Sequence, residues 1–158
     1  MPVSKYNQDQ LTFLANAFEL NALPVEAIIE WCDKQILDQD DPDYWLIELS
    51  LTKKHPIDVV NQLVDAGASL SIDDDLFMAI LSEAYFQKRM NAERAIQLLK
   101  ERFCYIDWEE MTELRQEIYV IEDANDWNES EAIERLDTLL RPYQSYYKKK
   151  TSEIGMKT

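Results

Sequence analysis

Glycine is scarce in this sequence, with only Gly67 and Gly155 among its 158 residues. Tight β-hairpins and nucleotide-binding loops usually need several glycines, because their backbones take conformations that a Cβ atom disfavours. We therefore expect neither a sheet built from hairpins nor a phosphate-binding loop. The fold class that remains is all-α.

Cysteine and histidine are also scarce. Two cysteines, Cys32 and Cys104, are too few for a disulfide framework, and a single histidine, His55, leaves little for catalytic or metal chemistry. Cys32 shares an apolar helical face with Ile28 and Ile36, which is typical of a buried structural thiol. Neither Cys104 nor His55 has a sequence neighbour that would activate or orient it. We predict no catalytic residue, no metal site, no cofactor and no enzymatic activity.

One acidic segment matches part of a calcium-binding loop. Asp123, Asn125 and Glu134 stand at positions 1, 3 and 12 of an EF-hand frame. Position 5 is then Trp127, and position 6 is Asn128, where the frame needs a glycine. We therefore expect no calcium site here.

Basic residues are few, and long apolar runs are missing. There are 16 Lys and Arg against 31 Asp and Glu, which gives a formal net charge of −15. Such a charge repels DNA, RNA and anionic membranes. No stretch approaches the roughly 18 apolar residues of a membrane span, and Met1–Gln10 lacks the pattern of a signal peptide. We expect a soluble, cytoplasmic protein that binds neither nucleic acid nor membranes.

Apolar residues recur at helical spacing in eight segments, which we expect to form four helical hairpins. The expected helices are Asp9–Leu20 with Val25–Leu37, Tyr44–Lys54 with Ile57–Ala66, Asp73–Arg89 with Ala92–Phe103, and a last pair running from Asp107 to an Asn125–Asn128 turn and on to Leu140. Ile28, Val60 and Ile96 anchor three second arms at spacings of 32 and 36 residues. This spacing suggests a solenoid-like stack, and an irregular helical bundle is the alternative.

The chain has the size and the 46% apolar content of one ordinary domain. We expect a single helical domain over residues 1–142, in which Pro142 ends or bends the last helix. Residues 143–158 should form a basic C-terminal tail that is partly frayed. The predicted core consists of Ile28, Ile29, Cys32, Trp45, Leu49, Val60, Leu63, Ile80, Leu99, Leu114 and Ile118.

Negative charge is concentrated near the end of the predicted domain. From Asp107 to Asp137 there are twelve acidic residues and two basic ones. Glu109, Glu113 and Glu117 are successive i, i+4 neighbours, and each like-charge pair destabilises the helix by a few tenths of a kcal/mol. They occupy one arc of the predicted helix, distinct from its apolar stripe of Met111, Leu114, Ile118 and Ile121.

Aromatic residues beside this acidic arc are typical of an interface that anchors a basic partner. The predicted partner-binding residues are Trp108, Glu109, Glu110, Glu113, Glu117, Glu122, Asp123, Asp126 and Trp127. The alternative is that these acids only keep an acidic protein soluble.

The segment EAIIEWCDKQILDQDDPDYWLIELSL, residues 26–51, resembles a segment of small helical proteins from bacterial toxin and immunity loci. The shared pattern is a helix with Glu30, Trp31 and Asp33, an acidic turn containing proline, and an Ile-Glu-Leu-Ser-Leu run. The resemblance implies a cytosolic protein without catalysis of its own that covers the active surface of a cognate toxin.

The sequence therefore predicts a stoichiometric protein-binding inhibitor, most specifically an immunity protein for a basic, nuclease-like bacterial toxin. Such toxins are basic where they bind phosphates, and an acidic helical face complements them. The alternative is a helical-repeat adaptor or scaffold that binds a peptide or protein partner.

Overall fold

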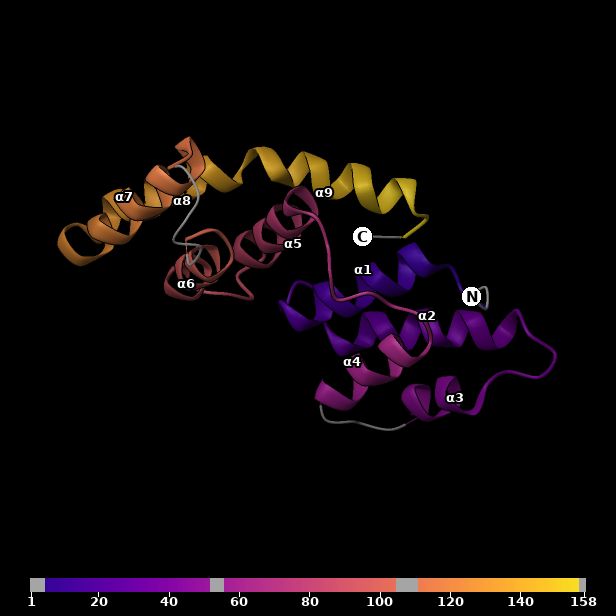
Figure 1. Ribbon diagram of the computed structural model, residues 1–158. Helices are drawn as coiled ribbons and strands as arrows, with labels where there is room; N and C mark the ends of the chain where they lie inside the picture. The colour runs from indigo at the N-terminus through magenta and orange to yellow at the C-terminus, as the bar shows by residue number, and fades with distance from the viewer. Residues whose placement is uncertain (1–4, 52–55, 105–110, 157–158) are drawn as a thin grey trace.

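The computed structural model describes residues 5–51, 56–104 and 111–156, and this part of the chain contains helices and no strand (Figure 1). The all-α prediction is confirmed. The helices are α1 Gln8–Glu19, α2 Val25–Leu37, α3 Tyr44–Leu51, α4 Pro56–Asp65, α5 Asp74–Phe86, α6 Ala92–Phe103, α7 Glu113–Trp127, α8 Glu129–Leu140 and α9 Pro142–Glu153. None of these helices is long and apolar enough to cross a membrane.

Five of the helices have a short polar residue as their N-cap. In each, the side-chain oxygen of the N-cap residue accepts a hydrogen bond from a backbone N–H of the first turn, which has no partner within the helix. The five N-cap residues are Asn7, Asp73, Asn91, Thr112 and Asn128.

Four helices end in the same way, with a residue in the left-handed backbone region just after the C-cap. The N–H of the following residue then bonds to a carbonyl five residues earlier, as in a Schellman motif. The left-handed residues are Asn21, Gly67, Lys88 and Gly155, with φ of 63°, 127°, 59° and 77°.

Helices α1–α4 and α5–α8 form two four-helix halves, and α9 follows them. In the first half α1 packs against α4 and α2 against α3, and in the second half α5 packs against α8 and α6 against α7. Helices α7 and α8 also form a tight hairpin, as the sequence predicts. The first half differs from the prediction. The sequence predicts that α1 pairs with α2 and α3 with α4, but in the structure α1 makes its main contacts with α4, and α2 makes its main contacts with α3.

The first two helices of each half correspond residue by residue at an offset of 67 positions. The corresponding buried pairs are Leu11 and Met78, Phe13 and Ile80, Leu14 and Leu81, Ala17 and Ala84, Ile28 and Ala95, Trp31 and Leu98, and Cys32 and Leu99. The left-handed residues Asn21 and Lys88 keep the same offset. This residue-by-residue correspondence covers α1 and α2 with α5 and α6, and its offset differs from the predicted spacings of 32 and 36 residues.

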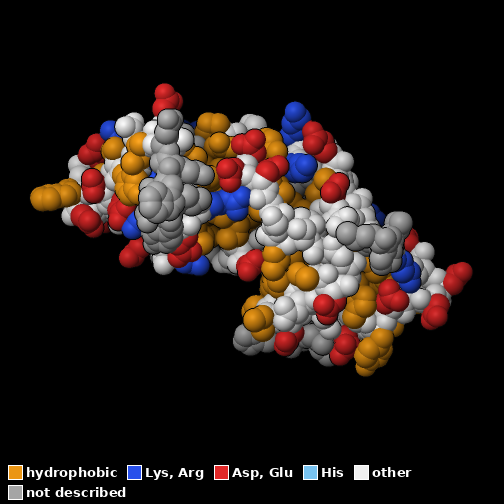
Figure 2. All heavy atoms as spheres, viewed as in Figure 1, with side chains coloured by type: hydrophobic (Ala, Val, Ile, Leu, Met, Phe, Trp, Pro, Cys, Tyr) orange, Lys and Arg blue, Asp and Glu red, His pale blue; other side chains and the backbone are white. Residues whose placement is uncertain are grey.

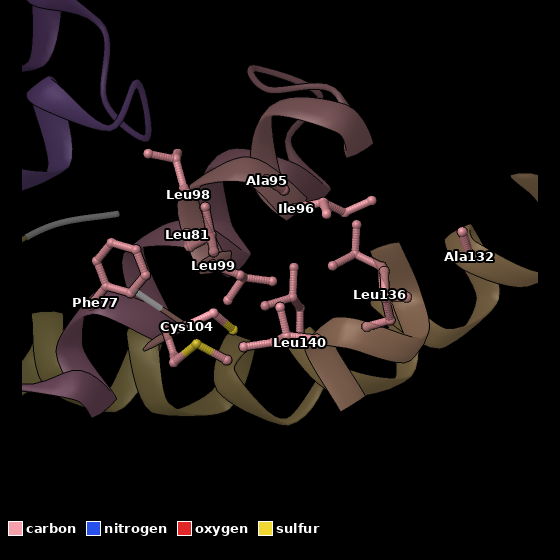
Figure 3. Close-up of a cluster of buried hydrophobic side chains, with 13 residues drawn as sticks. Phe77, Leu81, Ala95, Ile96, Leu98, Leu99, Cys104, Ala132, Leu136 and Leu140 are labelled. Atoms are coloured by element: carbon pink, nitrogen blue, oxygen red, sulfur yellow. The ribbon is translucent and has the colours of Figure 1, made fainter. Parts of the chain in front are cut away.

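Three clusters of buried apolar side chains form the core. One lies within α1–α4 and another within α5–α8, where Leu99 of α6 points toward Leu140 of α8 (Figure 3). The third cluster joins α1 to α5 and α9. This third cluster connects the two halves, and α9 runs beside α5 (Figure 1).

The prediction of a frayed tail is wrong for Pro142–Glu153, which forms α9. Pro142 begins this helix because its fixed φ suits a first turn, where its missing N–H costs nothing. Tyr147, Thr151 and Ile154 recur at helical spacing and are buried. The ring of Tyr147 lies 5.5 Å from that of Phe13, measured between centroids.

Most of the predicted core is buried as expected. Ile29, Trp45 and Leu114 are the exceptions, since they lie half-buried at the edge of the core. Two further apolar residues that begin or precede a helix are exposed. Helix α4 buries Val59 while Ile57 remains exposed, and Met111 is exposed outside any helix.

Candidate protein-binding surface on α7

Helix α7 begins later than the sequence suggests. The Oγ1 atom of Thr112 accepts a hydrogen bond from the backbone N–H of Arg115 at 3.1 Å, which places the first helical residue at Glu113. The predicted residues Trp108, Glu109 and Glu110 lie outside the described residues. On α7 itself, the expected acidic arc is therefore reduced to Glu113 and Glu117.

The inner face of α7 fixes the helix on α6 and α8. Ile118 and Ile121 are fully buried, and Arg115 is 7% exposed. At the edge of this face, the hydroxyl of Tyr119 donates a hydrogen bond to the backbone carbonyl of Cys104 at 3.3 Å. These contacts hold the opposite face of α7 toward solvent.

Two of the predicted partner-binding acids are engaged within the protein. Glu117 accepts hydrogen bonds from Arg135 Nη1 of α8 at 3.1 and 3.2 Å. These bonds, with a further one to Glu131, raise the pKa of the Arg135 guanidinium. Glu122 is paired with Lys100 Nζ of α6 at 2.6 Å. Both acids thus connect α7 to its neighbours.

The other predicted acids on α7 point outward. Glu113, Asp123 and Asp126 are exposed, and none of them forms an ion pair with a described residue. Glu129 and Glu134 of α8 add two more exposed carboxylates nearby in the chain. This end of the molecule therefore carries a local negative charge that no ion pair with a described residue neutralises.

Apolar side chains lie among these acids. Trp127 is 88% exposed at the end of α7, Val120 is 40% exposed, and Met111 is 53% exposed just before the helix. Val120, Asp123 and Trp127 are spaced i, i+3 and i+7, so they form one outward stripe. Figure 2 shows hydrophobic and acidic side chains interspersed at the α7 end of the molecule.

We call this surface the α7 face, and it consists of Met111, Glu113, Tyr119, Val120, Asp123, Asp126 and Trp127. A shallow depression of about 540 Å³ lies on it, between Met111 and Val120. No known protein family, characterised protein or solved structure matches this chain.

Sequence reasoning missed three residues of this face. The sequence predicts Met111 in the apolar stripe of a helix that begins earlier, and it predicts no role for Val120. Tyr119 is not among the predicted binding residues. The spacing of these residues from Trp127 shows the stripe only when Thr112 is taken as the N-cap.

Both cysteine thiols are buried among the described residues. Burial raises the pKa of the Cys32 thiol to about 12 and also raises that of Cys104. Both thiols are therefore protonated at neutral pH, and a protonated thiol is a poor nucleophile. His55 lies outside the described residues. Among the described residues, no group of three His, Cys, Asp or Glu side chains could hold a metal ion.

Proposed function

We propose that this chain is a stoichiometric protein-binding inhibitor that acts in the cytoplasm. Its specific role would be that of an immunity protein, which neutralises a basic, nuclease-like bacterial toxin through the α7 face and has no catalytic activity of its own. The observation that carries the proposal is the 88% exposure of Trp127 beside acids that lack cationic partners among the described residues.

An exposed tryptophan supports a binding role because of its size. Burying a large apolar side chain contributes roughly 1.5–3 kcal/mol, and tryptophan is enriched among the residues that dominate protein interfaces. Trp127 ends a capped and well-packed helix, so its backbone is already ordered before binding. Little conformational entropy is then lost when a partner covers the ring.

The surrounding charge supports a basic partner. Glu113, Asp123 and Asp126 flank the apolar stripe without an intramolecular cation among the described residues, so a partner's Lys or Arg side chains would meet carboxylates that are free to pair. Charges arranged in this way accelerate association and reject acidic partners. A nuclease is basic where it binds phosphates, and covering that surface blocks its substrate.

The adaptor alternative is favoured by a different observation, the duplication of the four-helix unit. Repeated helical units often present extended surfaces to peptides. An adaptor would bind an extended segment along both halves, whereas an inhibitor of the proposed kind would depend on the α7 face.

The test is co-expression with the product of the adjacent reading frame, because an immunity gene lies beside its toxin gene. We expect that product alone to stop bacterial growth, and the present chain to restore growth. Trp127→Ser should lose protection while remaining folded by circular dichroism. Leu70→Ser, which changes an exposed leucine outside the α7 face, is the matched control and should protect fully. A harmless neighbour product, or full protection by Trp127→Ser, would contradict the proposal.

A further inference from the structure

The first half of the chain presents a helix face that corresponds to the α7 face. Helix α3 packs against α2 as α7 packs against α6, so the two helices hold the same place in the duplicated fold. On α3, Tyr44 is 73% exposed and Leu51 is 77% exposed. Glu48 stands between them at i, i+4 and i+7 spacing, and we call these three residues the α3 face.

The α3 face has the same composition as the outward stripe of α7. In α7 an acid, Asp123, separates Val120 from Trp127, and in α3 an acid separates an aromatic from an aliphatic residue. Large apolar side chains exposed to this extent are unusual when they gather on one helix, and such patches mark interaction sites. The surface of the α3 end shows projecting hydrophobic side chains among acidic ones (Figure 2).

The charge around the α3 face matches the same class of partner. The turn before α3 contains Asp38, Asp40 and Asp41, which are exposed and form no ion pair with a described residue. Asp43 in the same turn forms an ion pair with Lys5, with Nζ 3.4 Å from Oδ1. Its other carboxylate oxygen accepts a hydrogen bond from the hydroxyl of Tyr6. The other three carboxylates, which form no ion pair within the described part of the chain, favour a basic occupant, as the acids of the α7 face do.

The two faces lie at opposite ends of the molecule, with α5 and α1 between them (Figure 1). A typical protein interface covers only about 800 Å² on each partner, so one globular partner would not reach both ends. We infer that the chain carries two related docking faces, α7 and α3, and binds two copies of a basic protein, one at each end. The inference rests on the proposed function of the α7 face and adds a second site and a stoichiometry.

The experiment is a calorimetric titration with a synthetic helical peptide that has lysines on one face and leucines on the other. We expect two peptides to bind each chain, with affinities that fall as salt is added. Trp127→Ser should remove one site, and the double variant Tyr44→Ser, Leu51→Ser should remove the other. The control Leu70→Ser should keep both sites, because Leu70 is an exposed leucine that belongs to neither face.

The outcomes separate the inference from the proposed function. If a single site is found and only Trp127→Ser abolishes it, the α3 face does not bind and the inference fails, while the proposed function survives. If Trp127→Ser removes no site, both fail. If more than two peptides bind and neither variant changes their number, the peptides are attracted diffusely to an acidic surface. This outcome would overturn both the inference and the proposed function.

Discussion

The side-chain amide of Asn21 donates a hydrogen bond to the backbone carbonyl of Arg89 at 2.6 Å. Asn21 follows α1, and Arg89 comes directly after Lys88, the corresponding residue that follows α5. The bond therefore joins equivalent ends of the first helix in each half. Both ends depend on a residue other than glycine in the left-handed region, which L-residues adopt only at a cost.

Replacing Lys88 by glycine should stabilise the protein. A non-glycine residue in the left-handed region costs about 1–2 kcal/mol, and the greater freedom of glycine in the unfolded chain cancels part of the gain. We expect the free energy of unfolding to rise by roughly 0.5–1 kcal/mol, measured by urea denaturation. The matched control is Gln87→Gly, whose φ of −81° needs no glycine, and it should be destabilising. A lower urea midpoint for Lys88→Gly would contradict the prediction.

Replacing Gly155 by alanine should have the opposite effect. Its φ is +77°, and an added Cβ would lie 3.3 Å from Nε2 of Gln10. That same nitrogen donates to the carbonyl of Ile154 at 2.8 Å, while Oε1 of Gln10 accepts from the indole of Trp31 at 3.2 Å. The new methyl group therefore strains both the backbone and the contact that holds the end of α9 to the first half.

We expect Gly155→Ala to cost about 1–2 kcal/mol of stability in urea unfolding, with a change in the fluorescence of Trp31. The control is Ser152→Ala, an exposed helical position nearby, which should change stability by less than about 0.5 kcal/mol. Equal stability of Gly155→Ala and the wild type would show that the end of α9 is held elsewhere.

Alkaline pH should destabilise the fold through Cys32. Its pKa is raised by burial to about 12 from an ordinary value of about 9, so the unfolded chain releases this proton at lower pH than the native protein. The contribution of the protonated Cys32 thiol to the free energy of unfolding is fully present below pH 9. It is lost as pH rises toward 12, at up to roughly 1.4 kcal/mol per pH unit. Unfolding curves between pH 8 and 9, where unfolded tyrosines with an ordinary pKa of about 10 are still mostly protonated, should show the onset of this slope.

The variant Cys32→Ala should flatten that slope, although it is less stable at neutral pH because a buried side chain is shortened. Cys104→Ala serves as the comparison, since burial raises the pKa of that thiol as well. An unchanged slope in both variants would assign the alkaline loss of stability to other groups.

The sequence predicts helices better than it predicts their contacts. The bounds of α2 and α6 follow from local periodicity and from the residues that flank them, and they agree with the structure within a residue. The pairing of α1 with α4 depends on contacts between distant segments, which no local pattern encodes. The start of α9 was missed for another reason, because Pro142 can end one helix or begin the next.

The binding face was predicted in part. Its charge and Trp127 are visible in the sequence, but the sequence does not show which acids are already paired. Glu117 looks like a free acid until α8 brings Arg135 within 3.1 Å of it. Likewise, the sequence pattern places Met111 in the core. In the structure Thr112 is the N-cap of α7, so Met111 lies before the helix and is exposed.

The paired and unpaired acids of α7 should therefore act differently in binding. Replacing Glu113, Asp123 and Asp126 by their amides removes three exposed charges without breaking an ion pair among the described residues. We expect this triple variant to slow association with the adjacent-frame product severalfold at low salt. The difference should nearly vanish near 0.5 M salt, where screening confines charge interactions to a few Å.

The matched control is Glu117→Gln, which leaves the charge of the outward stripe in place and removes the carboxylate that holds Arg135. It should change the association rate little and lower stability by up to about 1 kcal/mol, the usual range for a partly exposed ion pair.

Trp127→Ala should raise the dissociation rate at both salt concentrations, because an apolar anchor is insensitive to screening. If Glu117→Gln slows association as much as the triple variant does, the steering charge belongs to the α7–α8 contact, and the three outward acids are not its source.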